Sequence, residues 1–231
     1  IARRAANDDI NACPNWPESF WAGAMTQGTG GTCYESNLAF FALLRSLGFT
    51  GYLTVNNMNE SIGCHTAIVI TLGDERWLVD VGIPIHVPIP LLTHQVTHRK
   101  GPFHPYTTTP NADNAYTLTR DRHPKPYIFT LIDQPVPEAD YCAITTADYD
   151  PDKGLFLDRV IVTRILRTAG HEQIWRFSAE TPPFQLESFQ AGDVTYHLLG
   201  DNIDTAADGI AAQFGIDHAI VIAALQHMTT S

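Results

Sequence analysis

Apolar residues at helical spacing predict one well-defined helix early in the chain. Between positions 38 and 47 they recur three or four residues apart, which is the repeat of one helix face. The repeat consists of Leu38, Phe40, Phe41, Leu43, Leu44 and Leu47. Gly48 follows directly and is typical of a helix end. We therefore expect a helix from about Cys33 to Leu47, after a loosely helical segment over residues 1–28.

The pattern changes to a period of two after residue 52. The runs HTAIVITL (65–72) and RWLVDVG (76–82) are rich in β-forming residues and are separated by Gly-Asp-Glu, which predicts a hairpin. Six prolines predict a long irregular stretch over residues 84–110. Further strand candidates are residues 116–120, 127–132, 157–166 and 172–178. Because residues 205–228 return to helical character, we expect a β meander or small barrel between two helical regions.

The predicted hairpin also places two polar residues relative to each other. If its loop is the two-residue Gly73–Asp74, Leu72 lies opposite Glu75, and the same register makes His65 and Asp80 diagonal neighbours on one face. Their backbones would then be about 7 Å apart. A three-residue loop would place the two side chains on opposite faces, so the contact depends on the register.

Composition and charge narrow the class of protein. A chain of 231 residues with 44% hydrophobic residues can bury a sizeable core. The net charge of -11 argues against nucleic acid or an anionic membrane surface as the main partner. The longest apolar run is far shorter than the roughly 20 residues that span a bilayer, and residues 1–30 lack the sections of a signal peptide. We expect a soluble, cytoplasmic protein with a small neutral or cationic substrate.

Candidate chemistry begins with Cys33 in TGGTCYESN, directly before the apolar helix. A helix start favours a thiolate, which is the nucleophilic form of cysteine. Gly30 and Gly31 would allow unusual backbone conformations and a close approach to the sulfur. A lone cysteine here is more often a small buried residue, so the functional interpretation depends on finding a base and a group that orients it. Neither paired CxxC nor HExxH motifs are present, so we expect no metal site.

His65 and Asp80 supply such a base and such an orienting group. A carboxylate inside the apolar run WLVDVG is costly to bury unless it has a partner. If it accepts a hydrogen bond from the imidazole, it fixes the tautomer and stabilises the imidazolium opposite a thiolate. We predict Cys33 as nucleophile, His65 as base and Asp80 as orienting residue. The alternatives are a core histidine with ordinary partners and an aspartate paired with backbone donors at a strand end.

The segments GGTCYESN, CHTAIVI and WLVDVG together resemble the arylamine N-acetyltransferase family. The resemblance implies an α+β, cysteine-protease-like fold in three parts. These parts would be an N-terminal helical segment over residues 1–50, a β-barrel over residues 51–155 and a C-terminal α/β lid over residues 156–231. The order Cys, His, Asp also fits the family.

The resemblance implies an activity and its substrates as well. Cys33 would take an acetyl group from acetyl-CoA as a thioester and pass it to an arylamine, hydrazine or similar amine in a ping-pong mechanism. Acetyl-CoA would be a substrate, with no tightly bound cofactor. The resemblance places Gly82 and Ile83 at the border of the acceptor pocket. Phe103 and Tyr106 are further candidates for substrate binding as aromatic residues, and the alternative for these two is ordinary core packing.

Three departures from the family pattern keep other interpretations open. Thr29 stands where an arginine is usual, the helical region before Cys33 is short, and Ile83–Pro84 replaces Phe-Gly. An amide synthase with a carrier-bound acyl donor, or an amidase that uses water, would keep the same three residues. A binding protein that retains the fold without chemistry is the third possibility.

Overall fold

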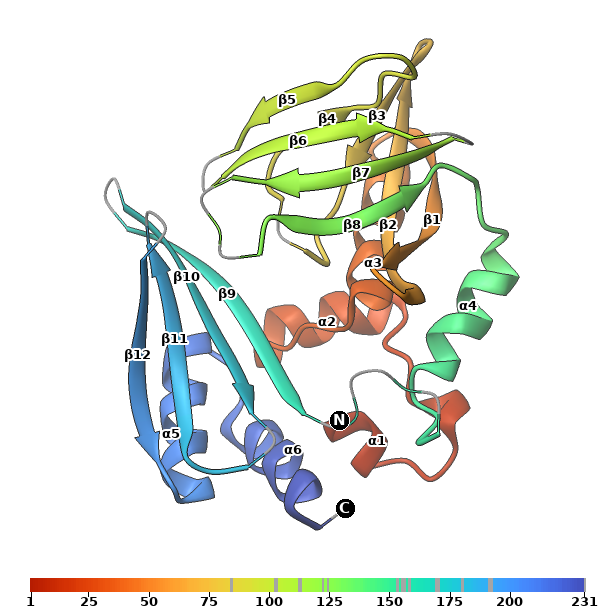
Figure 1. Ribbon diagram of the computed structural model, residues 1–231. Coiled ribbons are helices and arrows are strands. Elements are labelled where there is room, and N and C mark those ends of the chain that lie inside the picture. The colour runs from red at the N-terminus through yellow and green to blue at the C-terminus, as the bar shows by residue number, and fades with distance from the viewer. Residues whose placement is uncertain are drawn as a thin grey trace. The chain divides into compact units, whose positions relative to one another are not determined.

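The computed structural model is shown in Figure 1. It describes the backbone of all residues except 84, 102–103, 112–113, 122, 124, 153, 155–156, 158, 169–170, 180, 191–192 and 231. The side chains of residues 167–168, 171–172 and 229–230 are also left undescribed. The chain forms two compact units. The first consists of residues 1–14, 21–30 and 146–231, and the second of residues 15–20 and 31–145. The expected domain boundaries at residues 50 and 155 stay a prediction.

The second unit is built on an eight-stranded antiparallel sheet that curls into a barrel. Its strands are β1 (Thr50–Met58), β2 (Ser61–Leu72), β3 (Glu75–Val79), β4 (Ile89–Pro90), β5 (Thr97–Lys100), β6 (Pro105–Pro110), β7 (Ala115–Arg120) and β8 (Tyr127–Ile132). They follow the order β4-β3-β2-β1-β8-β7-β6-β5. The edge strands β4 and β5 contact each other, so the sheet nearly closes. The expected small barrel is confirmed.

The prediction of a long irregular stretch over residues 84–110 is wrong. Strands β4, β5 and β6 lie within it. The prolines are compatible with the sheet because Pro90, Pro105 and Pro110 occupy strand ends, where a missing N–H costs little.

The hairpin of β2 and β3 has the expected register. Leu72 pairs with Glu75, and the ladder continues to Ile68 and Val79. Gly73 has a φ of 60°, as two-residue hairpin loops require. The two-residue loop is therefore confirmed, and the chain beyond Val79 continues opposite the part of β2 that contains His65.

Helix α3 (Cys33–Ser46) packs against the outer face of the barrel sheet, and helix α4 (Glu138–Ala147) belongs to the same unit except for its last two residues. The buried cluster between α3 and the sheet consists of Tyr34, Leu38, Phe41, Leu53, Ile68, Ile70 and Tyr141. Alternate residues of β2, Ala67 and Val69, point into the barrel core instead. The strand that carries His65 is therefore covered on both faces.

The apolar stripe of α3 is narrower than its sequence predicts. Leu43 and Leu47 are 38% and 66% exposed, although both continue the helical repeat. Leu38 and Phe41 are buried against β1 and β2. Because the helix meets the sheet along one line, residues on the flanks of the stripe remain in contact with solvent.

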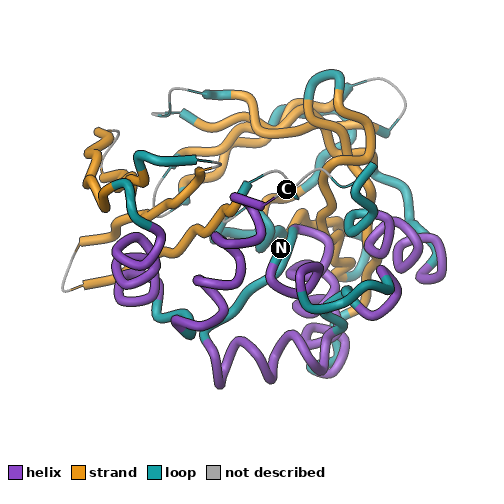
Figure 2. The backbone as a smooth tube through the Cα atoms, turned by 90° about the horizontal axis from the view of Figure 1, so that it is seen from below, coloured by secondary structure: helices purple, strands orange, loops and turns teal. Residues whose placement is uncertain are grey.

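The first unit contains a separate four-stranded antiparallel sheet with two helices, which can be followed in Figure 2. Its elements are α1 (Ala2–Ala5), a 3-10 turn (Ile10–Ala12), β9 (Val160–Thr168), β10 (His171–Ala179), β11 (Phe184–Gln190), β12 (Asp193–Gly200), α5 (Ile203–Phe214) and α6 (His218–Thr230). Helix α2 (Pro17–Gln27) contributes residues to both units. Phe177, Phe184 and Leu186 of this sheet pack against Ile210 and Phe214 of α5.

The predicted strands 157–166 and 172–178 are confirmed, and they form a second sheet with β11 and β12. This agrees with the expected C-terminal α/β region and not with one meander that continues the barrel. The helical region 205–228 is two helices, because Gly215 adopts a left-handed φ of 69° and ends α5. No helix in the described part of the chain has the length and apolarity to cross a membrane.

A buried ionic cluster ties the barrel strands together. Arg76 of β3 pairs with Asp133, which follows β8, and the Asp133 side chain is fully buried. The Tyr52 hydroxyl of β1 donates to Asp133 at 2.6 Å, and Arg76 donates to the Tyr116 hydroxyl of β7 at 3.3 Å. Burial and then Asp133 raise the pKa of Tyr52 to about 12. The cluster therefore joins four segments through one carboxylate.

We expect Asp133→Asn to lower the free energy of unfolding by about 3 kcal/mol, because it leaves Arg76 facing an uncharged group in the interior. The matched control is Glu138→Gln, since Glu138 forms an exposed pair with Arg45 at 4.0 Å that should contribute less than about 1 kcal/mol. Urea unfolding followed by circular dichroism measures both. Equal losses in the two variants would contradict the role of the cluster.

Candidate active site

Cys33 is the first residue of helix α3, and Glu35 fixes that start. One oxygen of Glu35 accepts the N–H of Thr32 at 2.9 Å, and the other accepts the N–H of Asn15 at 2.6 Å. A carboxylate in the first turn satisfies N–H groups that lack an intrahelical acceptor and is stabilised by the helix dipole. Glu35 is buried, so the position of the thiol is set from inside the unit.

The reason for glycine before the cysteine differs from the one that the sequence suggested. Neither Gly30 nor Gly31 has a positive φ, so no unusual backbone conformation is involved. A Cβ on Gly31 would lie 2.5 Å from a carboxylate oxygen of Glu35, whereas a Cβ on Gly30 would meet nothing within 4 Å. Gly31 is therefore needed for Glu35 to fold back over the helix start.

His65 and Asp80 form the contact that the hairpin register predicts. Nε2 of His65 lies 2.7 Å from Oδ2 of Asp80, and both side chains are almost completely inaccessible to solvent. The imidazole ring also packs against Phe129, with 4.6 Å between ring centroids. Asp80 directly follows β3, so the end of the ladder leaves its carboxylate free to turn toward β2.

The other oxygen of Asp80 is held by three donors. Oδ1 accepts the N–H of Gly82 at 2.8 Å, the N–H of Ile83 at 3.1 Å and Nδ2 of Asn37 at 3.1 Å. A buried carboxylate with this many hydrogen bonds is fully satisfied and held in one orientation. The sequence left two partners open for Asp80, an imidazole or backbone donors at the strand end. The carboxylate binds both, one with each oxygen.

Asn37 connects three segments, a role that no pattern in the sequence predicted. Its Nδ2 also donates to the carbonyl of Thr66 at 2.8 Å, and its Oδ1 accepts the N–H of Val81 at 3.1 Å. Asn37 is fully buried and lies one helical turn after Cys33, on the same helix face. The sequence does contain a signal for this role, because Asn37 is a polar amide four residues after the cysteine and beside the apolar stripe.

The thiol of Cys33 completes the arrangement. Its side chain is close enough to the imidazole of His65 to raise the pKa of that ring, and Sγ lies 3.9 Å from the carbonyl oxygen of Cys64. Because Asp80 engages Nε2 of His65, Nδ1 is the ring nitrogen available to the sulfur. Sulfur, imidazole and carboxylate therefore form one row.

The electrostatics of this row favour a protonated imidazole. Burial by itself lowers the pKa of His65, but the charge and hydrogen bond of Asp80, followed by those of Cys33, outweigh it and raise the pKa to about 10. An imidazolium beside a sulfur stabilises the thiolate, which is the reactive nucleophile. The arrangement is suited to nucleophilic acyl transfer.

Gly82 lies where the turn after β3 meets the first turn of α3. A Cβ at this position would lie 2.6 Å from Cβ of Cys33 and 3.0 Å from Nδ2 of Asn37. Only glycine allows this approach. The geometry therefore gives Gly82 a packing role against the nucleophile candidate, and substrate binding by Gly82 stays a prediction.

The other predicted substrate-binding residues lie in or beside the barrel core. Ile83 packs against this core, and Tyr106 on β6 is a buried member of it. Phe103 lies outside the described residues. Contact of these residues with a substrate stays a prediction. Among the described residues, no group of three or more His, Cys, Asp or Glu side chains could hold a metal ion.

The chain matches one protein family by its sequence and shares one fold with several solved structures. A family model described as N-acetyltransferase matches residues 19–180, which is more than half of the chain. No curated protein matches. The chain is similar to the solved structure of Mycobacterium marinum arylamine N-acetyltransferase in complex with CoA, with 18% identity and a TM-score of 0.77 over 99% of this chain and 86% of that chain.

Two further solved structures show the same fold. An arylamine N-acetyltransferase from M. smegmatis is 20% identical, with a TM-score of 0.73 over 97% of this chain and 85% of that one. The enzyme from Mycobacterium abscessus is 22% identical, with a TM-score of 0.72 over 92% and 77% of the two chains. The expected α+β fold of arylamine N-acetyltransferases is therefore confirmed.

Gly82→Ala should lower kcat/KM about 100-fold, because the added methyl group displaces Cys33 from the imidazole and a shift of about 1 Å at a reacting group has this effect. The control is Gly30→Ala, where a Cβ meets no atom within 4 Å and activity should be retained. Steady-state kinetics with circular dichroism as a check on folding distinguishes the two. Full activity in the Gly82 variant would contradict the close packing described above.

Asp80→Asn should lower the pKa of His65 from about 10 to its ordinary value near 6.5 or below, since burial then acts without the opposing charge. Titration of the ring nitrogens by NMR measures the change. The pair also makes the free energy of unfolding depend on pH, because the folded chain binds the proton of His65 more tightly than the unfolded chain does. The contribution of the His65–Asp80 pair is full below about pH 6.5 and declines as pH rises toward 10. An unchanged pKa in the variant would be the contrary result.

Proposed function

Because the chain belongs to the N-acetyltransferase family, we propose that it transfers an acetyl group from acetyl-CoA to an arylamine, a hydrazine or a similar amine. The observation that carries this proposal is the buried His65–Asp80 pair beside the sulfur of Cys33. The M. marinum neighbour, solved in complex with CoA, supports an acyl-CoA donor. Acetyl-CoA is then a substrate and free CoA a product, and the transfer uses no tightly bound cofactor.

In the first half-reaction, the thiolate of Cys33 attacks the carbonyl carbon of acetyl-CoA. The tetrahedral oxyanion is stabilised by the backbone N–H of Cys33 at the helix start, where N–H groups have no intrahelical acceptor. The C–S bond to CoA then breaks, and the departing sulfur takes the proton of the His65 imidazolium. The products are CoA and an acetyl thioester on Cys33, with His65 left neutral.

In the second half-reaction, the amine attacks the thioester and His65 accepts the proton that the nitrogen loses. The new C–N bond forms as the bond to Sγ of Cys33 breaks, which restores the thiolate and imidazolium pair. Asp80 keeps the ring in one orientation through both steps and stabilises its positive charge. The three residues therefore act as nucleophile, acid-base catalyst and orienting group.

The amine acceptor is assigned to the region of Gly82, Ile83, Phe103 and Tyr106. The support for this assignment is that Ile83 packs against the barrel core, which contains Tyr106 and also Phe129, the ring that His65 contacts. Aromatic and aliphatic side chains suit an aromatic acceptor. The free thiols of Cys13, Cys33, Cys64 and Cys142 support a reducing, cytoplasmic location.

Incubation with acetyl-CoA should place one acetyl group on the chain, and peptide mass analysis should locate it on Cys33. Cys33→Ala should abolish the modification and turnover while the fold is retained. Cys142→Ala on helix α4 is the matched control and should behave as the unaltered protein. Release of the acetyl group as an amide only when an amine is added supports the transferase. Release by water at the same rate without an amine would favour an amidase.

A further inference from the structure

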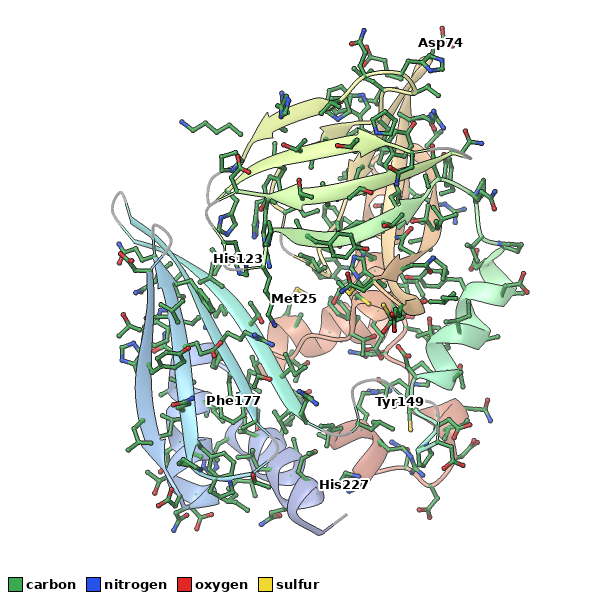
Figure 3. All side chains as sticks on the ribbon, viewed as in Figure 1. Met25, Asp74, His123, Tyr149, Phe177 and His227 are labelled. Carbon is green, nitrogen blue, oxygen red and sulfur yellow. The ribbon has the colours of Figure 1, made fainter. Side chains whose placement is uncertain are left out.

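The four-stranded sheet of the first unit changes from apolar to polar along the face that packs on α5. Phe177 of β10, labelled in Figure 3, pairs with Leu186 of β11, and both are buried against that helix. One row further along the same face, Arg164 of β9 pairs with Trp175. Arg164 donates to the carbonyl of Phe214 at 2.6 Å, which is the last residue of α5. Helix α5 therefore ends beside this row.

Five polar side chains gather on the same face from this row onward. They come from β10, β11 and β12 and line a hollow of about 320 Å³: Gln173, Ser188, Gln190, Asp193 and Thr195. Ser188 pairs with Trp175 on one side and with Thr195 on the other. Gln190 pairs with Asp193, two positions further along each strand. Because residues two apart share a face, the sheet register brings the five together, and the volume is within the range of small-molecule sites.

Two aromatic rings hold part of this hollow in place. The ring centroids of Trp175 and His197 lie 4.7 Å apart. Nε1 of Trp175 donates to Oε1 of Gln173 at 2.9 Å, and Oγ of Ser188 is hydrogen-bonded to Nε2 of His197 at 3.0 Å. Ser188 is 4% exposed. The amide of Gln173 and the hydroxyl of Ser188 are therefore oriented before a ligand arrives, which lowers the cost of binding.

The charges of these residues indicate the kind of ligand. Asp193 is the one charged residue among the five that line the hollow, and its carboxylate opposes an anion. A single exposed carboxylate also binds a cation only weakly. The amides and hydroxyls both donate and accept hydrogen bonds. The hollow therefore suits a neutral ligand whose groups do the same, which is the property of hydroxyl groups.

We propose that this hollow binds a neutral polyhydroxylated molecule, a sugar or a polyol. Its hydroxyls would donate to the carboxylate of Asp193 and accept from the amides of Gln173 and Gln190. The C–H groups of a sugar ring carry a slight positive charge, so they pack favourably on the face of an indole such as that of Trp175.

This site is separate from the proposed acetyl transfer. The residues of the hollow belong to the first unit, whereas Cys33, His65 and Asp80 belong to the second. Binding at the hollow can therefore be measured without turnover.

The test is titration of the protein with glucose and with trehalose, followed by NMR of the indole and side-chain amide groups. Trp175→Phe identifies the signal of this indole among the four tryptophans. We expect saturable shifts of Nε1–H of Trp175 and of the amides of Gln173 and Gln190. The Kd should be about 1 mM or lower for at least one of the two sugars. Phosphate and tetramethylammonium, the anionic and cationic probes, should leave these signals unchanged.

Gln190→Ala and Asp193→Ala each remove one group from the hollow. Both residues are exposed, so folding should be retained, with circular dichroism as the check. Each substitution should weaken sugar binding about tenfold, because it leaves a ligand hydroxyl without its partner. The matched control is Gln185→Ala. Gln185 is an exposed glutamine of the same strand, but it lies on the opposite face, where it pairs with Leu198, so binding should not change.

Three outcomes overturn the proposal. The first is the absence of a saturable shift at Trp175 with either sugar. The second is equal weakening of binding by Gln185→Ala and by Gln190→Ala. The third is a saturable shift with phosphate or tetramethylammonium and with neither sugar, which would assign the hollow to a charged ligand. Failure to acetylate Cys33 would count against the proposed function alone.

Discussion

The buried carboxylate of Asp80 is the group on which the arrangement of the site depends. One of its oxygens contacts His65, and the other accepts three hydrogen bonds from Asn37, Gly82 and Ile83. A carboxylate in an apolar interior is stable only when its charge and lone pairs are satisfied. This requirement brings together helix α3, strand β2 and the turn after β3, which are far apart in the chain.

The start of helix α3 is fixed by several independent contacts. Glu35 binds the N–H groups of Thr32 and Asn15, and the Tyr141 hydroxyl of α4 donates to the carbonyl of Tyr34 at 2.8 Å. The Tyr34 hydroxyl in turn donates to the carbonyl of Gly63 near the start of β2 at 2.6 Å. These groups are mostly buried, so the sulfur is held by a rigid framework. Preorganisation of this kind lowers the cost of aligning a nucleophile with its base.

The barrel serves the site in two ways. Its strand β2 is packed on one face by α3 and on the other by the barrel core, which keeps water from His65 and strengthens its interaction with Asp80. From inside the barrel, Phe129 of β8 packs against the imidazole with 4.6 Å between ring centroids. The same sheet therefore positions the acid-base pair and supplies part of its apolar surroundings.

The sequence determined the features that depend on local order. Helical spacing predicted α3, and Gly73–Asp74 fixed the hairpin loop, from which the contact of His65 with Asp80 followed. It misjudged the stretch over residues 84–110, because prolines at strand ends do not interrupt a sheet. The strand pattern alone also did not separate β9 and β10 from the barrel, although the family resemblance did. Strand pairing between distant segments has no local signal.

Only the tertiary structure decided which polar residues hold the site together. Asn37, Gly82 and Tyr141 gain their roles from contacts with residues 29 to 107 positions away. Spacing along the chain reports which residues share an element. The cost of burying unpaired polar groups decides which partners they find across elements, and that choice is made when the whole unit folds.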